Sequence, residues 1–303
     1  MSYQPAVKVS LIICTRNRAS QLAACLKTMT RLRSLSPWEL IIVDNGSTDD
    51  TTAAIQRFRE SYSGDVTALV EPLPGLGRAR NRGWRAAQGE IVAFTDDDCY
   101  PDPHFLDQVV VGFGEDKRLG FMGGRILLHD PTDLPITLQE GEQREELPPG
   151  SFIRTGLIQG ANFALRKAAV EAVGGFDDLF GAGALFACED VDILARISAA
   201  GWLGAYDPRP LVYHHHGRKT EAEASRLMRG YDRGRGAYYA KCLLNPSLRK
   251  VYLRNWYWRV RKQSLGRSSR ELVAAAEYFA RAVAHRFTSR WRRDPAGWPH
   301  GQA

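Results

Sequence analysis

Residues 89–98 read GEIVAFTDDD, an apolar run with β-branched residues that leads directly into three aspartates. Similar short apolar runs occur earlier in the chain, at residues 7–14, 40–43 and 66–70. Segments with a helix-like pattern lie between and after them, at residues 19–31, 49–61, 77–88 and 103–114. Because the runs are continuously apolar, we expect strands that are covered on both faces. The repetition therefore predicts an α/β fold, a mostly parallel sheet flanked by helices.

The rest of the chain divides into an irregular segment, a second ordered part and a helical end. Residues 126–155 lose periodicity and contain several prolines, which predicts a long loop. Next we expect a strand at 156–165, a helix at about 190–200 and a strand at 203–206 or 211–216. Residues 218–293 have a mostly helical pattern, interrupted at Asn245-Pro246 and around Gly266. We therefore divide the chain into a catalytic domain, 1–217, and a C-terminal region, 218–303.

The charge of the chain is unevenly distributed. The net charge is +7, yet residues 218–303 carry 20 Lys and Arg against 6 Asp and Glu. Residues 1–217 carry the remaining 21 basic and 28 acidic residues, so an acidic body precedes a basic region. Five scattered cysteines without a C-x-x-C pair, and no secretory signal at the start, favour a cytoplasmic protein with reduced thiols.

The three aspartates after the 91–95 run are the most informative polar feature. Like charges this close together repel and raise one another's pKa unless a cation neutralises them. Hard oxygen ligands in small number suit Mg²⁺ or Mn²⁺ shared with substrate phosphates. In an extended segment Asp96 and Asp98 point to the same side, so one can contact a ribose while the other holds the metal. The alternative is an acidic solvated loop, or capping of the next helix.

Other polar residues follow predicted strands, where ligands bind in open parallel sheets. Thr15 and Arg16 follow the first strand, and Asp44 follows the second. Asp44 suits a ribose hydroxyl or a base edge, or it forms a turn with Asn45-Gly46. Arg80 lies near the start of a helix after a glycine-rich turn, which suits phosphate, although a solvated basic face is the alternative.

Three later features complete the candidate site. Gly160 and Asn162 follow an apolar run and could line a pocket, although a glycine there also permits close packing. Glu189 and Asp190 open a helix, so they either cap it or supply a general base. In the run 214–216 of three histidines, alternation places His214 and His216 on one face, where imidazole could complete a metal shell. The alternative is a polar strand end.

Together these segments resemble the family 2 glycosyltransferases with a GT-A fold over about residues 7–217. The resemblance is carried by residues 9–18 (VSLIICTRNR), 39–49 (ELIIVDNGSTD), 75–83 (GLGRARNRG), 89–98, 174–177 (GGFD) and 189–194 (EDVDIL). It implies an inverting transfer in which Asp190 is the base that deprotonates an acceptor hydroxyl. It also implies a divalent metal, Mg²⁺ or Mn²⁺, at Asp98, with His214 or His216 as a late ligand. Expected nucleotide-sugar contacts are Thr15, Arg16, Asp44, Arg80, Asp96 and Asp97, and expected acceptor contacts are Gly160, Asn162 and Glu189.

The resemblance also limits the reaction. The Gln-x-x-Arg-Trp motif and flanking membrane helices of processive polysaccharide synthases are absent from the sequence, which favours a single transfer. We expect a UDP-, GDP- or dTDP-sugar donor and a saccharide or lipid-linked acceptor, as in bacterial polysaccharide or glycolipid biosynthesis. One rival is a nucleotidyltransferase, although its glycine-rich loop is missing at residues 14–18. The other is a binding protein that holds a nucleotide-sugar without turnover.

The basic C-terminal region combines arginines with aromatic residues, among them residues 238–239 and 256–258. An amphipathic helix is predicted at about 269–291, with Phe287 and Trp291 on its apolar stripe. Such a composition suits nucleic acid or an anionic membrane surface, and the resemblance favours the membrane, at the inner face of the plasma membrane. No nucleic-acid partner is expected. The alternative is that these helices pack on the body and neutralise its acidity.

Overall fold

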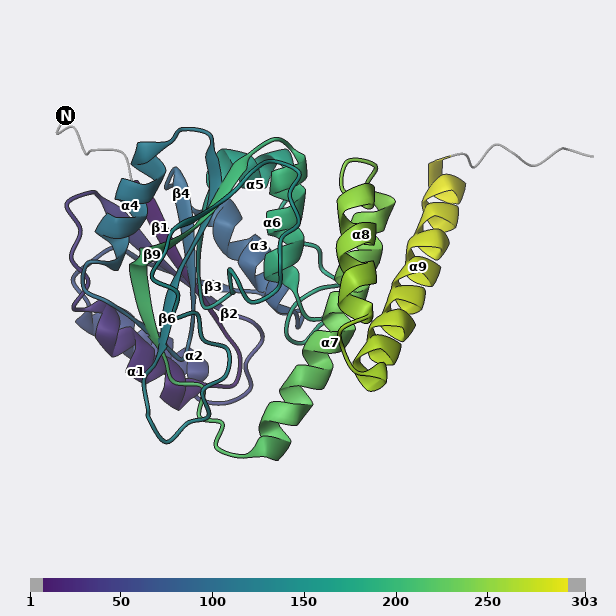
Figure 1. Cartoon of the computed structure of the whole chain (residues 1–303). Helices are drawn as coiled ribbons and strands as arrows, with labels where there is room; N and C mark the ends of the chain where they lie inside the picture. Colours follow the sequence, from purple (N-terminus) through teal and green to yellow (C-terminus); the bar gives the residue numbers. More distant parts are fainter. Residues whose placement is uncertain (1–7, 294–303) are drawn as a thin grey trace, which may run out of the picture.

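A computed structural model describes residues 8–293, with side chains placed as far as residue 284. The predicted apolar positions Phe287 and Trp291 therefore lie outside the described side chains. A twisted sheet lies between two layers of helices, and three further helices stand to one side of it (Figure 1). The α/β fold predicted from the repeated apolar runs is confirmed.

The sheet contains nine strands within the described residues, in the order β3-β2-β1-β4-β8-β6-β9-β5, with β7 paired to β9. The first four strands run parallel: β1 (Val9–Thr15), β2 (Trp38–Asp44), β3 (Val66–Val70) and β4 (Ile91–Asp96). The second half is mixed: β5 (Cys99–Pro101), β6 (Leu119–Leu128), β7 (Glu145–Leu147), β8 (Asn162–Arg166) and β9 (Leu203–His214). Of these, β8 is antiparallel to both β4 and β6, whereas β6 and β9 run parallel.

Helices cover both faces of the sheet. Those of the α/β part are α1 (Ala19–Met29), α2 (Thr51–Ser61), α3 (Leu76–Ala86), α4 (Phe105–Glu115), α5 (Lys167–Ala172) and α6 (Glu189–Ala199). The strands alternate between two buried apolar clusters: Leu11 and Ile13 face α1, α2 and α4, whereas Ile12 faces α3, α5 and α6. Because helices cover both faces of the sheet, the strands are apolar on both faces, as the sequence predicted.

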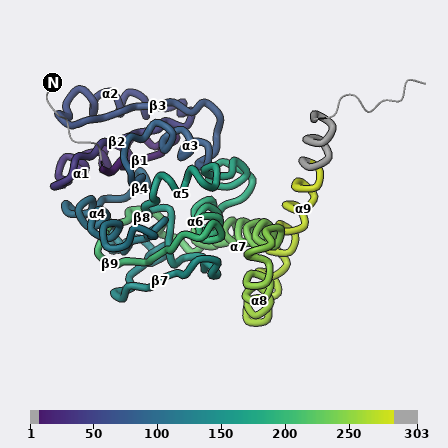
Figure 2. The backbone as a smooth tube through the Cα atoms, turned by 90° about the horizontal axis from the view of Figure 1, so that it is seen from above, coloured from purple at the N-terminus to yellow at the C-terminus, as the bar shows by residue number. Residues whose placement is uncertain are grey.

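The C-terminal helices are α7 (Glu221–Leu244), α8 (Arg249–Val260) and α9 (Leu265–Arg293). Tyr238 and Tyr239 of α7, Tyr252 of α8 and Ala274 of α9 belong to the same apolar cluster as the face of the sheet that α3 and α6 cover. Figure 2 shows the three helices grouped beside α6, with α8 below α7 and α9 on the side away from α6. None of the described helices has the length and apolar character needed to cross a bilayer.

Two boundaries differ from those predicted. Of the predicted 156–165 strand only residues 162–165 are extended, as part of β8, and the residues before them lie mainly in turns. Residues 203–206 and 211–214, from the two alternatives, belong to one twelve-residue strand, β9. The 126–155 segment is irregular as expected, apart from the end of β6 and the short strand β7.

Candidate active site

The aspartate triplet spans the turn between β4 and β5, and its three side chains have different surroundings. Asp97 is buried; it accepts a hydrogen bond from Thr15 Oγ1 (2.6 Å) and pairs with Arg18 Nε (2.8 Å). Burial raises the pKa of Asp97 to about 7, although Arg18 acts against this shift. Asp96 is the most open, with 36% of its side chain exposed. Asp97 therefore anchors the turn to β1, and Asp96 faces outward.

Asp98 is brought together with His214, the last residue of β9. His214 Nε2 lies 3.4 Å from Asp98 Oδ1, and Arg18 Nη2 lies 2.6 Å from Asp98 Oδ2. Burial acts to raise the pKa of Asp98, but His214 and Arg18 outweigh it and the pKa lies below its ordinary value. Ligand atoms of Asp98, Cys99 and His214 all lie within 4.8 Å of one another. A carboxylate and an imidazole in this arrangement fit a divalent cation such as Mn²⁺.

The thiol of Cys99 contributes little to this candidate metal site. Its side chain is fully buried, and burial raises the pKa of the thiol well above its ordinary value. Because only the thiolate is a good metal ligand, the neutral thiol leaves Asp98 and His214 as the donors, with Asp96 nearby.

Arg80, from α3, is enclosed by the protein rather than directed at solvent. Only 2% of the residue is exposed, and its guanidinium lies 5.1 to 5.8 Å from the centres of three phenylalanine rings. It donates to Glu189 Oε1 (2.8 Å), to Asp96 Oδ1 (3.4 Å) and to the carbonyl of Gly160 (3.2 Å). The side chain is therefore bonded to protein groups, with Asp96 and Glu189 held beside it, and its contact with a donor phosphate stays a prediction.

Asp190 lies in the first turn of α6, directly beside this arginine cluster. Its Oδ2 accepts from the Gly160 backbone N–H (2.9 Å), and its Oδ1 accepts from Val191 N–H (2.8 Å). Burial raises the pKa of Asp190, and Arg80 and these two amides partly offset it. A carboxylate with a raised pKa, held by fixed donors, has the properties of a general base.

Gly160 is required for packing. A Cβ at this position would lie 2.7 Å from Arg80 Nη2, so a side chain would displace the guanidinium from its carboxylates. The residue nevertheless contacts the site directly, because its N–H binds Asp190 and its carbonyl binds Arg80. The close-packing alternative and the site location predicted for Gly160 are thus both consistent with the structure.

Asn162 and His216 are hydrogen-bonded to other parts of the protein. Asn162 is buried, and its amide donates to the carbonyls of Arg125 (2.8 Å) and Pro210 (2.9 Å), so it has a structural role, and its acceptor contact stays a prediction. His216 uses both ring nitrogens: Nε2 bonds the Leu134 carbonyl (2.9 Å), and Nδ1 accepts from the Arg218 N–H (3.0 Å). His214 is therefore the candidate ligand of the two.

The residues at the ends of β1 and β2 serve different purposes. Asp44 is buried and accepts from Ser47 N–H (2.9 Å) and Thr52 Oγ1 (2.7 Å), so it stabilises the turn after β2. Arg16 is exposed and has no hydrogen bond or ion pair with any described residue, which leaves its guanidinium available for a ligand.

Two residues near the site were not identified from the sequence. Arg18 pairs with both Asp97 and Asp98, and its position three residues after the β1 end is the signal that could have identified it. Tyr231 of α7 is the second: burial and the charges of Asp190 and Glu189 raise the pKa of its phenol. No sequence pattern connects Tyr231 to the base, because α7 reaches the site only through tertiary packing.

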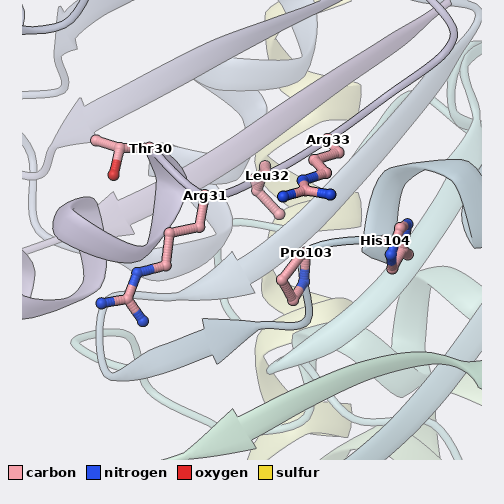
Figure 3. Close-up of a pocket in the computed structure, with 6 residues that line it drawn as sticks. All are labelled: Thr30, Arg31, Leu32, Arg33, Pro103 and His104. Atoms are coloured by element: carbon pink, nitrogen blue, oxygen red, sulfur yellow. The ribbon is translucent and has the colours of Figure 1, made fainter.

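Cavities of the molecule lie beside this site rather than within it. A cavity of about 470 Å³ is lined by Thr30, Arg31, Leu32, Arg33, Pro103 and His104, none of which is a predicted site residue (Figure 3). Another, of about 360 Å³, lies between Ile136 and residues of α7 and α9. Neither of these two cavities contains a residue that the sequence predicted for the site.

Comparison with known proteins agrees with this arrangement. Residues 10–174 match the model of glycosyl transferase family 2. The glycosyltransferase AglE of Haloferax volcanii is 27% identical over 214 residues, which cover 67% of each chain. The pre-mycofactocin glycosyltransferase of Mycobacterium tuberculosis is 30% identical over 222 residues, which cover 69% of this chain and 43% of that one. A shorter match to an uncharacterized glycosyltransferase of Nostoc covers only 36% of that relative.

Solved structures share the fold. A Pyrobaculum calidifontis mannosyltransferase, PcManGT, in complex with GDP-Man and Mn²⁺ aligns with a TM-score of 0.63 and 22% identity, over 93% of this chain and 76% of that one. S. aureus TarS in complex with UDP-GlcNAc also aligns with a TM-score of 0.63, at 17% identity, over 90% of this chain and 80% of that one.

Proposed function

The chain belongs to glycosyl transferase family 2, and from this premise we propose that it is a metal-dependent, inverting enzyme. It transfers one sugar from a UDP-, GDP- or dTDP-sugar to a hydroxyl of a saccharide or lipid-linked acceptor. The observation that carries this proposal is the presence of two acidic groups at one site: the buried Asp98 beside His214, and the partly buried Asp190 beside Arg80. Asp98 and His214 are suited to hold the cation that binds the departing diphosphate, and Asp190 is suited to accept the proton of the attacking hydroxyl.

Asp98 and His214 would hold Mg²⁺ or Mn²⁺, with Asp96 nearby. When bound, this cation supplies positive charge that stabilises the departing nucleoside diphosphate. Arg18 and Thr15 fix the turn through Asp97 and Asp98, so the carboxylates are in place before a donor arrives. The exposed Arg16, directly after β1, remains available to a donor phosphate or base.

Asp190 accepts the proton of the acceptor hydroxyl. The hydroxyl oxygen then forms a bond with the anomeric carbon of the donor, while the bond from that carbon to the diphosphate oxygen breaks and the electron pair leaves with the diphosphate. The amides of Gly160 and Val191 orient the carboxylate. Glu189 was predicted to contact the acceptor; we now assign it to holding Arg80, since it is buried against that guanidinium.

We further propose that the acceptor is lipid-linked and reached from the cytoplasm, at the inner face of the plasma membrane. The name of a Mycobacterium tuberculosis relative, N-acetylglucosaminyl-diphospho-decaprenol L-rhamnosyltransferase, supports this acceptor class; it is 26% identical over 61% of this chain. On this proposal residues 1–217 carry the chemistry, and residues 218–303 bring the enzyme to its acceptor. The biological context is polysaccharide or glycolipid biosynthesis.

A panel of UDP-, GDP- and dTDP-sugars with Mn²⁺ tests the proposal. Thermal shift identifies the donor that binds, and release of the nucleoside diphosphate measures turnover. We expect Asp98→Ala to lose both metal-dependent binding and turnover, and Asp190→Asn to bind the donor but lose about 10²-fold or more in transfer rate. No turnover of any donor would favour a binding protein, and release of pyrophosphate from a nucleoside triphosphate and a sugar phosphate would favour a nucleotidyltransferase.

A further inference from the structure

α8 and the turn after it form the most basic stretch that the structure leaves exposed. Residues 249–265 contain no acidic residue and six basic ones: Arg249, Lys250, Arg254, Arg259, Arg261 and Lys262. Large apolar side chains are exposed among them: Leu253 (57%), Tyr257 (53%), Trp258 (54%) and Leu265 (90%). Exposed apolar groups interleaved with cations are unusual on a surface that contacts only water, and they indicate an interaction surface.

The basic residues of α7 and α9 are used differently. Lys241 of α7 lies 2.7 Å from both Asp177 and Asp192 of the α/β part. Arg235 and Arg270 pair with the buried Asp232. These pairs neutralise acidic groups, as the packing alternative predicted.

On α8, only Arg259 joins this network, at 3.6 Å from Glu271. The other five basic residues make no ion pair with any residue that the structure describes. Ion pairs with the α/β part, or within the helices themselves, therefore occupy most basic residues of α7 and α9 among the described residues, but only one of α8.

The exposed side chains of α8 share one face of the helix. Lys250, Leu253, Arg254, Tyr257, Trp258 and Arg261 follow a spacing of three and four residues. Tyr252 and Trp256, on the opposite side, are buried against the rest of the protein. We refer to these six exposed residues, together with Leu265, as the α8 surface.

Arg261 organises the aromatic part of the α8 surface. It donates to Tyr257 Oη (2.7 Å) and lies 5.5 Å and 5.9 Å from the ring centres of Tyr257 and Trp258. The two rings lie 5.5 Å apart. The rings are thus held together on the surface beside a cation, although their apolar faces remain in water.

We propose that the α8 surface docks on an anionic lipid bilayer. Tyrosine and tryptophan favour the boundary between headgroups and acyl chains, leucines enter the acyl region, and arginine and lysine bind anionic headgroups. A nucleic acid would use the cations and rings, but it offers no environment for Leu253 and Leu265. Only the purpose of this docking rests on the proposed function: it would bring the enzyme to a lipid-linked acceptor.

The C-terminal helices are connected to the candidate site through α7, which starts seven residues after His214. The start of α7 and the turn between α8 and α9 both point toward the lower edge of Figure 1.

Sedimentation of the full chain with vesicles tests the proposal without any substrate. We expect binding to vesicles of phosphatidylcholine with phosphatidylglycerol, weak binding to phosphatidylcholine alone, and release by salt. Lys250→Gln with Arg254→Gln should weaken binding about 30-fold, since each basic residue at an anionic surface contributes about fivefold. Leu253→Gln with Trp258→Gln should weaken binding by about tenfold or more.

Two controls isolate the surface. Arg57→Gln with Arg59→Gln removes two exposed helical arginines of α2, and Leu35→Gln removes an apolar side chain that is 97% exposed. Both should sediment as the wild type does. All the substituted side chains are exposed, so thermal unfolding should be unchanged and confirm that each variant folds.

Three outcomes would overturn the proposal: equal sedimentation of the α8 variants and the controls, equal binding to neutral vesicles, or binding of single-stranded RNA with no binding to any vesicle. Nucleotide-sugar turnover is measured separately. An enzyme that turns over donor but ignores vesicles therefore contradicts this inference alone, and one that binds vesicles without turnover contradicts only the proposed function.

Discussion

Replacing Glu189 with glutamine should stabilise the protein at pH 8. One guanidinium, Arg80, is close to three carboxylates, those of Glu189, Asp96 and Asp190. A single cation cannot neutralise all three, and burial raises the pKa of Glu189 from 4.5 to about 7, against the effect of Arg80. Glutamine has the shape of the protonated acid, and its amide oxygen can still accept from Arg80.

The size and sign of the effect follow from linkage. In the unfolded chain Glu189 ionises near pH 4.5, and in the folded protein near pH 7. Because the folded pKa is the higher one, the stabilisation from the bound proton is complete below pH 4.5 and is lost as the pH rises through 7. The difference between the two pKa values corresponds to roughly 3 kcal/mol. The Glu189→Gln variant does not lose this stabilisation as the pH rises. Its unfolding free energy should therefore differ little from that of the wild type at pH 5 and exceed it by up to roughly 3 kcal/mol at pH 8.

Urea unfolding at pH 5 and pH 8, without divalent cations, measures this difference. Urea is uncharged and leaves the ion pairs unscreened. Asp96 and Asp190 remain in both proteins, so their own titration largely cancels. Glu142→Gln, at an exposed ion pair with Arg125, is the matched control and should change the unfolding free energy by less than about 0.5 kcal/mol at either pH. A Glu189→Gln variant that is less stable than the wild type at pH 8 would show that the ionised pair with Arg80 is net stabilising, and would refute the reasoning.

Three further predictions concern neighbouring residues. Arg80→Met should lower the unfolding free energy by about 3–5 kcal/mol at pH 7, because the carboxylates around Arg80 lose their cation, and by less at pH 5. Urea unfolding at the two pH values measures this, and an equal loss of unfolding free energy at both would contradict it. His214→Ala should raise the Mn²⁺ concentration that supports half-maximal turnover by about tenfold or more, whereas His216→Ala should not. Equal Mn²⁺ concentrations for the two variants would contradict the choice of His214 as the ligand. Asn162→Ala should lower the unfolding free energy by about 1–3 kcal/mol, since it removes the partner of two carbonyls, and it should leave the KM for the acceptor unchanged. A higher acceptor KM with no loss of stability would support the predicted acceptor contact instead.

The parallel half of the sheet could be predicted because its strands are local, continuous apolar runs with helices between them. β9 could not, and its own residues give the reason. Pro208 and Pro210 interrupt the apolar pattern in the middle of the strand, which therefore reads as two short strands. The structure accommodates them at a shift in the pairing of β6 and β9, between Gly123 and Arg125, where ladder hydrogen bonds are not required. A bulge depends on the partner strand, which the local sequence does not specify.

Locations of site residues were easier to predict than their contacts. Parallel strands end at one edge of a sheet, so polar residues that follow strands must lie near one another. This rule placed Thr15, Asp97 and Asp98 correctly at one edge, but it does not say which groups pair. Thr15 and Asp97 are 82 residues apart in the chain, and Arg80 and Glu189 are 109 apart. The first pair depends on the pairing of β1 with β4 and the second on the packing of α3 near α6, and no local pattern contains that information.

Arg80 shows how charge balance limits a prediction based on residue type. Phosphate and carboxylate attract an arginine by the same geometry, so a basic residue near a predicted phosphate site is equally suited to a carboxylate of the protein. If Arg80 turned outward, the buried Glu189 and the partly buried Asp96 and Asp190 would lose their cation, and such a loss costs more than an exposed phosphate contact returns. We therefore expect the enclosed arginine to stay with the protein. We propose that the donor contact is made instead by Arg16, which lies at the same edge of the sheet and has no ion pair with any described residue.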